Sequence, residues 1–176
     1  MVGEVRTNNG RNASTCFVII DSQSVKNTNT AREKGYDAGK KISGIKRHIA
    51  VDSQGLPHAI AVTTANKTDR QGALMALGMH KASLNCLVNV LADGGYTGKP
   101  FADEVHKLLG ATVEVAKRSE LHTFKVIPKR WVVERSFAWL EQCRRLWKNC
   151  ERFLNTSLQF INLAFLVLLL RRKNTG

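Results

Sequence analysis

The stretch CFVIIDSQSVKNT, residues 16–28, places an acidic residue directly after an apolar run. Residues 16–20 are apolar throughout, which predicts a buried strand over Phe17–Asp21. Polar residues follow Asp21 at once, with neither Gly nor Pro to mark an ordinary turn. A carboxylate in this place is a helix cap, a chance surface residue or part of a site at the rim of a sheet. These interpretations can be distinguished only if other acidic residues of the chain occupy similar places.

Asp93 repeats the arrangement. The apolar run Leu87 to Ala92 leads into it, and Gly94 and Gly95 follow, which lets backbone or ligand approach closely. In open sheets, ligands bind beyond the ends of strands, where such residues converge. Taken alone, either aspartate is equally compatible with an unrelated turn.

The third candidate lies in PKRWVVERSFAWLEQCRRLWKN, residues 128–149, which predicts an amphipathic helix from about Lys129 to Asn149. Its apolar face, expected to lie in the core, carries Val133, Phe137, Leu140 and Trp147. The opposite stripe carries Arg130, Glu134, Glu141, Arg145 and Lys148. This stripe is either a solvated face or part of a site, and spacing alone does not choose between Glu134 and Glu141. Trp131 and Trp139 are expected in the core rather than as base-stacking groups.

The rest of the chain predicts a mixed α/β domain, with the element order β, ββ, α, β, α, β, α, α. Residues 1–15 read as a loosely ordered polar tail, and residues 22–41 as a loop. A hairpin is expected over 45–63, with Asp52 in its turn. Asp69 fits a helix cap, and Asp37 a loop. The apolar run 158–170 is shorter than the roughly 20 residues that span a bilayer, so it predicts a buried core helix.

The chain is strongly basic: 27 Lys and Arg against 14 Asp and Glu give a net charge of +13. The excess is concentrated in residues 26–48 and 117–176, which favours binding to a nucleic acid over a merely soluble basic protein. Lys46 and Arg47 lie on a predicted strand and would either track DNA phosphates or form an ordinary exposed strand face. The four cysteines show no zinc-ligand spacing and predict mostly buried free thiols in a reducing cytoplasm.

Four motifs together resemble the catalytic half of bacterial insertion-sequence transposases with an Asp-Asp-Glu triad, above all the group named after insertion sequence five. They are IIDSQSVK (19–26), GIKRHIAVDSQGLPHAIAVTTANKTDR (44–70), LADGGYTG (91–98) and RWVVERSFAWL (130–140). The resemblance implies a ribonuclease H-like fold, a mixed sheet flanked by helices. It places the catalytic domain at residues 16–173, after the polar tail 1–15.

The resemblance assigns the triad to Asp21, Asp93 and Glu134, which would hold two Mg²⁺ or Mn²⁺ ions. Asp21 would bridge both ions, while Asp93 and Glu134 would each bind one. Arg130, four residues before the glutamate, would orient it or a phosphate. Related transposases carry a Tyr and a basic residue where this chain has Ile127 and Glu141. Arg144 or Lys148 would then take over the missing contact with DNA.

The implied partners are the insertion-sequence ends and the target DNA, acted on by a homodimer or larger assembly in the bacterial cytoplasm, without a membrane. Family members usually carry an N-terminal helical recognition region, whereas 20 residues precede Asp21 here. An upstream reading frame could supply that region. Two alternatives stay open: a catalytically silent DNA-binding fragment that inhibits transposition, and a hydrolytic nuclease or resolvase of the same fold.

Overall fold

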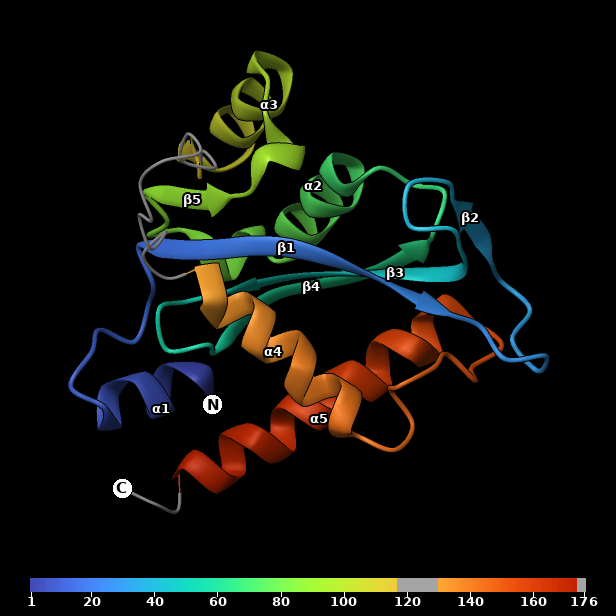
Figure 1. Ribbon diagram of the computed structural model, residues 1–176. Coiled ribbons are helices and arrows are strands. Elements are labelled where there is room, and N and C mark those ends of the chain that lie inside the picture. Colours follow the sequence, from blue (N-terminus) through green and yellow to red (C-terminus); the bar gives the residue numbers. More distant parts are fainter. Residues whose placement is uncertain (117–129, 174–176) are drawn as a thin grey trace, which may run out of the picture.

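A mixed six-stranded sheet forms the centre of the computed structural model, which describes residues 1–116 and 130–173 (Figure 1). Its strands are β1 (Phe17–Lys26), β2 (Gly35–Asp37), β3 (Ile42–Val51), β4 (Pro57–Thr64), β5 (Asn89–Ala92) and β6 (Thr112–Val115). The order across the sheet is β2-β3-β1-β5-β6, and β4 pairs with β3 as well. β1, β3 and β4 are antiparallel neighbours, whereas β1, β5 and β6 run parallel.

Alternating residues of β1 supply both cores of the molecule, because successive side chains of a strand point to opposite faces. Val18 and Ile20 pack beneath α2 (Asp69–Met79) and α3 (Lys99–Leu109). Ile19 and Val25 pack on the other face, beneath α4 (Arg130–Gln142) and α5 (Leu154–Lys173). Figure 1 shows these helix pairs as separate layers above and below the sheet.

Helix boundaries follow the expected capping signals on the α2/α3 face. Thr68 caps α2 through a reciprocal capping box with Gln71. α3 begins with Pro100 in its first turn and ends before Gly110, whose φ of 71° is the left-handed conformation that favours glycine there. Both helices occupy the places that the predicted element order gives to the first two helices after the hairpin.

Three boundary predictions are wrong. β1 continues past Asp21 to Lys26, because its antiparallel pairing with β3 extends after the parallel neighbour β5 has ended. Within the predicted loop 22–41, residues 35–37 form the edge strand β2. α4 ends at Gln142, seven residues before the predicted end at Asn149.

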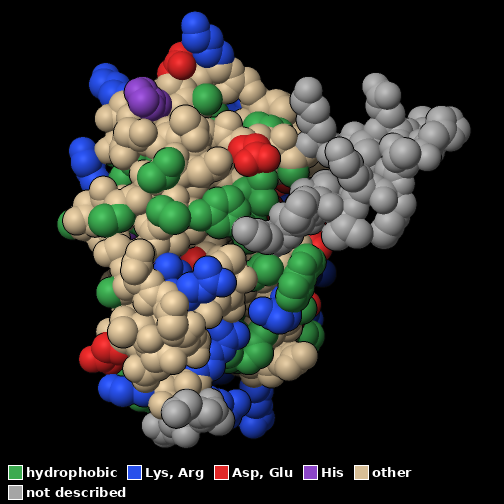
Figure 2. All heavy atoms as spheres, turned by 90° about the vertical axis from the view of Figure 1, so that its left-hand side faces the viewer, with side chains coloured by type: hydrophobic (Ala, Val, Ile, Leu, Met, Phe, Trp, Pro, Cys, Tyr) green, Lys and Arg blue, Asp and Glu red, His purple; other side chains and the backbone are tan. Residues whose placement is uncertain are grey.

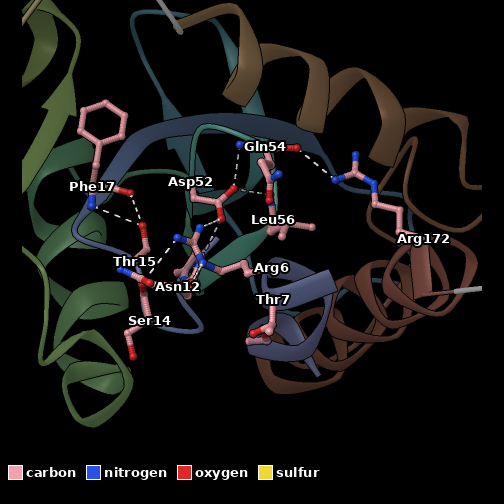
Figure 3. A network of polar contacts seen from close by, with 12 residues as sticks. Arg6, Thr7, Asn12, Ser14, Thr15, Phe17, Asp52, Gln54, Leu56 and Arg172 are labelled. Atoms are coloured by element: carbon pink, nitrogen blue, oxygen red, sulfur yellow. Dashed lines mark hydrogen bonds and ion pairs between the residues drawn. The ribbon is translucent and has the colours of Figure 1, made fainter. Parts of the chain in front are cut away.

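The N-terminal residues form a docked helix, α1 (Val2–Asn8), where a loose polar tail was expected. Val5 packs with Leu56 and Leu169, and all three are buried. Arg6 donates to the carboxylate of Asp52 in the β3–β4 turn, and this buried ion pair fixes the helix to the sheet (Figure 3). The polar composition hid these anchors, because Val2, Val5 and Arg6 stand among polar residues.

α5 is buried on one face only. Ile161, Phe165 and Leu169 point into the molecule, whereas the opposite face exposes Leu163, Leu166, Val167 and Leu170. Within residues 1–116 and 130–173, α5 alone has the length and composition that would suffice to cross a bilayer. Its packing against β4 accounts for the apolar residues of its inner face. The four cysteines are free, as expected, but Cys16 and Cys86 are exposed rather than buried.

Candidate active site at the end of two parallel strands

Asp21 and Asp93 lie on or directly after two neighbouring parallel strands, β1 and β5. In the parallel pair of β1 and β5, Ile19 is opposite Leu91. The same register carried two residues further sets Asp21 opposite Asp93, which directly follows the last residue of β5. Neighbouring strands are about 4.8 Å apart, so two carboxylates converge at this rim.

Local hydrogen bonds hold both carboxylates in place. The Asp21 Oδ1 atom accepts from the Ser22 backbone N–H at 2.7 Å. The Asp93 side chain starts the short 3-10 turn Gly94–Tyr96 (η2), where its Oδ1 accepts from the Gly95 N–H at 2.9 Å. A β-carbon at Gly95 would lie 3.0 Å from the same oxygen, so a glycine keeps this approach open.

Tyr96 lies beneath the aspartates. It is 1% exposed, and within the described residues its hydroxyl has no hydrogen-bond partner. Burial raises the pKa of Tyr96 well above its ordinary value, and the charges of Asp21, Asp69 and Asp93 add to the shift. The buried hydroxyl of Tyr96 is therefore subject to the charges of three carboxylates. Sequence reasoning missed this role, although Tyr96 belongs to the motif that contains Asp93.

Glu134 lies on α4, whose buried residues Val133, Phe137 and Leu140 fix the helix against the sheet face to which Asp21 belongs. Glu134 itself is exposed. Seven residues further along α4, Glu141 accepts a hydrogen bond at 2.7 Å from Gln23, two residues after Asp21 on β1. Strand and helix are therefore joined next to the predicted triad.

The donor set suits a hard divalent cation, because Mg²⁺ prefers carboxylate oxygens. In the part of the chain that the structure describes, however, no three His, Cys, Asp or Glu side chains lie close enough together to hold a metal ion. The register of β1 and β5 leads Asp21 and Asp93 to one rim, and Glu134 lies on α4, which packs on the same face of the sheet as Ile19.

Lys46 forms a polar cluster on the opposite face. Its Nζ atom lies 2.9 Å from Asp69 and 3.3 Å from Asp37, and it donates to the Lys67 carbonyl at 3.0 Å. The Ser24 hydroxyl contributes most to a pKa of about 2 for Asp37. Asp69 reaches the Asp93 turn, with its Oδ2 4.0 Å from the β-carbon position of Gly95. Asp37 and Asp69 are thus more than the turn and cap residues expected.

The prediction that Lys46 and Arg47 lie on an exposed strand face is wrong. Lys46 is 5% exposed, Arg47 1% and the neighbouring His48 0%. β3 lies between β1 and β4, with helices on both faces of the sheet, so these side chains point into the two packed layers. Lys46 meets two carboxylates there and Arg47 a backbone carbonyl, and their burial removes both from the surface that DNA phosphates could reach.

The remaining basic candidates lie on or after α4. Arg130 is its first residue, and the Arg130 side chain lies outside the described part of the structure. Arg144 follows the helix and is exposed. The Lys148 ammonium lies 4.3 Å from the Trp147 ring centre. Figure 2 shows Lys and Arg side chains gathered in the lower half of one face of the molecule.

Tryptophans of the α4 region also depart from expectation. Trp131 is 53% exposed and Trp147 59%, so neither belongs to the core. The Arg135 guanidinium covers the Trp131 ring at 4.6 Å. Trp139 does pack against the core beside Phe165, with ring centres 5.7 Å apart. The early end of α4 removes Trp147 from the helical face on which it was placed.

Comparison with known proteins gives one family. Residues 12–170 match the family model described as a transposase DDE domain. A protein of Burkholderia cepacia described as a transposase for insertion sequence element IS402 is 32% identical over 128 residues, which are 69% of this chain and 60% of that protein. The chain therefore spans less than two thirds of this relative.

Solved structures show the same fold. A chain of the simian T-cell lymphotropic virus intasome, in complex with PP2A regulatory subunit B56 gamma, matches 86% of this chain and 47% of its own length, with a TM-score of 0.56 and 15% identity. The catalytic core domain of BIV integrase matches 86% of this chain and 82% of its own, with a TM-score of 0.51 and 10% identity. The expected ribonuclease H-like fold is confirmed.

Proposed function

The chain belongs to the transposase DDE-domain family, and from this premise we propose that it cuts and rejoins DNA at the ends of a bacterial insertion sequence of the insertion-sequence-five-like group. Residues 16–173 would form the catalytic domain. The observation that carries the proposal is the register of β1 and β5, which pairs Ile19 with Leu91 and, continued by two residues, sets Asp21 opposite Asp93. A hydrolase, an integrase and a transposase of this fold would share that rim, and membership of the transposase DDE-domain family favours the transposase.

Asp21, Asp93 and Glu134 would together hold two Mg²⁺ or Mn²⁺ ions. Bound cations activate the attacking oxygen and stabilise the departing 3′ oxygen of a phosphodiester. The protein contributes stiffness, because two of the acids end or follow buried strand segments and the third projects from a packed helix. Cation charge would also offset the mutual repulsion of the three carboxylates.

DNA would lie along the basic residues of the α4 region. Arg130, Arg144 and Lys148 are the proposed phosphate contacts, since they lie on or after α4, the helix that carries Glu134. The net charge of +13 favours a polyanion at any accessible surface. Two copies of the chain, one at each end of the element, would form the assembly that acts on both ends.

The test uses the purified chain, a labelled duplex with the terminal sequences that flank its gene, a target plasmid, and Mg²⁺ or Mn²⁺. We expect metal-dependent cuts at the duplex end, followed by joining to the plasmid. Asp93→Asn and Glu134→Gln should lower cleavage by at least about 100-fold. Asp103→Asn and Glu104→Gln, at exposed positions of α3, are the matched controls and should change little.

Each other outcome has a defined meaning. Unchanged cleavage by Asp93→Asn or Glu134→Gln would show that the triad is wrongly assigned. Cutting without joining would identify a hydrolytic nuclease of the same fold. Salt-sensitive DNA binding with no metal-dependent cutting would identify a silent DNA-binding protein.

A further inference from the structure

Gln23 and Glu141 join the middle of the sheet to α4 in a contact that the proposed chemistry does not use. The Gln23 Nε2 atom donates to Glu141 Oε1 at 2.7 Å, across 118 positions of sequence. The other amide atom, Gln23 Oε1, is buried and has no hydrogen-bond partner among the described residues. The contact lies at the solvent side of the apolar layer that buried residues such as Val133 and Phe137 form, and Glu141 itself is exposed.

Arg47 lies next to this link. It is the cross-strand neighbour of Gln23 on β3 and is 1% exposed. Its Nη2 atom donates at 2.7 Å to the carbonyl of Leu146, just beyond the end of α4, while Nε and Nη1 find no partner in the described chain. Burial lowers the pKa of Arg47 to about 10, and the negative charge of Glu141 is the largest effect that opposes the shift. The guanidinium and the carboxylate therefore face the same layer.

Helix and strand geometry connect this link to the proposed triad. Glu134 and Glu141 are seven residues apart, close to two turns, so they share one stripe of α4 about 10 Å apart. Asp21 and Gln23 are two residues apart and share one face of β1, about 7 Å apart. In Figure 1, β1 and α4 both run from left to right, with α4 sloping away from the strand. Asp21 precedes Gln23 on β1, and Glu134 precedes Glu141 on α4, so both proposed ligands lie on the N-terminal side of the Gln23–Glu141 contact.

We propose that Glu141, held by Gln23 and facing Arg47, is a positioning residue that sets the place of Glu134 relative to Asp21; this rests on the proposed function. Two attachments hold the C-terminal end of α4 and the segment that follows it: Glu141 is bound by Gln23, and the Leu146 carbonyl is bound by Arg47. A helix fixed at one end carries its other end to a defined place, because it moves as a rigid rod over so short a length. Glu134 and Glu141, which spacing could not tell apart, thus receive different roles.

The experiment measures Mn²⁺ binding to the full chain by calorimetry, without DNA. Glu134→Gln reports whether the metal site exists. Glu141→Ala should weaken Mn²⁺ binding roughly tenfold, the scale of effects from outside the coordination shell. Glu141→Gln keeps an acceptor for the Gln23 amide and should recover most of the affinity. Glu151→Ala, which removes a 2.7 Å contact with Arg145, is the control and should leave binding unchanged.

The Gln23→Ala variant tests the same link from the strand, and leaves α4 intact if Glu141→Ala impairs folding. The double variant Gln23→Ala with Glu141→Ala should bind Mn²⁺ no more weakly than the more impaired of the two single variants, because both substitutions remove the same hydrogen bond. Weaker binding by Glu134→Gln but unchanged binding by Glu141→Ala and Gln23→Ala would overturn the positioning role and leave the proposed function intact. If the wild-type chain shows no Mn²⁺ binding, or binding that Glu134→Gln leaves unchanged, both the positioning role and the proposed function are overturned.

Discussion

His48 is fully buried on β3, where its Nε2 atom lies 3.0 Å from the Thr63 hydroxyl of β4. Burial lowers its pKa to about 4, and the charge of Asp69 opposes the shift only in part. In the unfolded chain the imidazole takes up a proton near pH 6.5. The folded protein holds it neutral over this interval, so acid favours the unfolded state.

The free energy of unfolding should therefore fall between pH 6.5 and about pH 4, by at most about 3 kcal/mol. Urea unfolding at several pH values measures this, and His48→Gln should flatten the slope in that window. Asp37, whose pKa is lowered to about 2, loses its contribution only below about pH 3.8 and so serves as an internal reference. Equal slopes for the wild type and His48→Gln would contradict the assignment.

Gly72 and Gly78 occupy the same helix, α2, and should respond oppositely to alanine. A β-carbon at Gly72 would meet the His48 ring at 2.0 Å, whereas at Gly78 its nearest neighbour is 3.9 Å away. Gly72→Ala should lower the free energy of unfolding by about 1–3 kcal/mol through overpacking. Gly78→Ala should raise it by up to about 1 kcal/mol, because alanine favours helix. Thermal unfolding of both variants measures these changes. Equal effects of the two substitutions would rule out the close contact between position 72 and the His48 ring.

At the scale of elements, the sequence predicted what local patterns control. The capping signals of α2 and α3 and the apolar run of β1 gave these elements their type and start. The end of β1 could not be predicted, because pairing with β3 rather than its own residues carries the strand to Lys26. The predicted end of α4 was wrong for a similar reason. The helical spacing of apolar residues continues through residues 143–149, but the Leu146 carbonyl accepts a hydrogen bond from Arg47 instead of from a helical N–H.

The candidate site shows the same division. Asp21 and Asp93 could be selected as acids after apolar runs, but only the register of β1 and β5 sets them opposite each other. Lys46 and Arg47 read as surface cations, since no sequence pattern reveals that Asp69 or the Leu146 carbonyl will meet them inside. Which side chains face one another depends on tertiary packing between segments far apart in the chain.

At the scale of the whole molecule, the β3–β4 turn joins both ends of the chain. Asp52, in this turn, accepts from Arg6 of α1, from His58, and from the backbone N–H groups of Gln54 and Leu56 (Figure 3). Burial works against its charge, but the hydrogen bond from His58, followed by those from the two backbone N–H groups, keeps the pKa of Asp52 below its ordinary value. Arg172 of α5 donates to the Gln54 carbonyl at 3.0 Å, which brings the C-terminal helix to the same turn.

Removal of Arg6 should therefore destabilise the molecule and not only α1. Asp52 is 1% exposed and would lose a cationic partner, so Arg6→Ala should lower the free energy of unfolding by about 3 kcal/mol. Arg11→Ala, at an exposed position close by, should change it by less than about 0.5 kcal/mol. Urea unfolding measures both, and Asp52→Asn combined with Arg6→Ala should cost less than the two single losses added, because one interaction is shared. Additive losses would mean that the ion pair does not hold α1 to the turn, and that Val5, packed on Leu56 and Leu169, holds it instead.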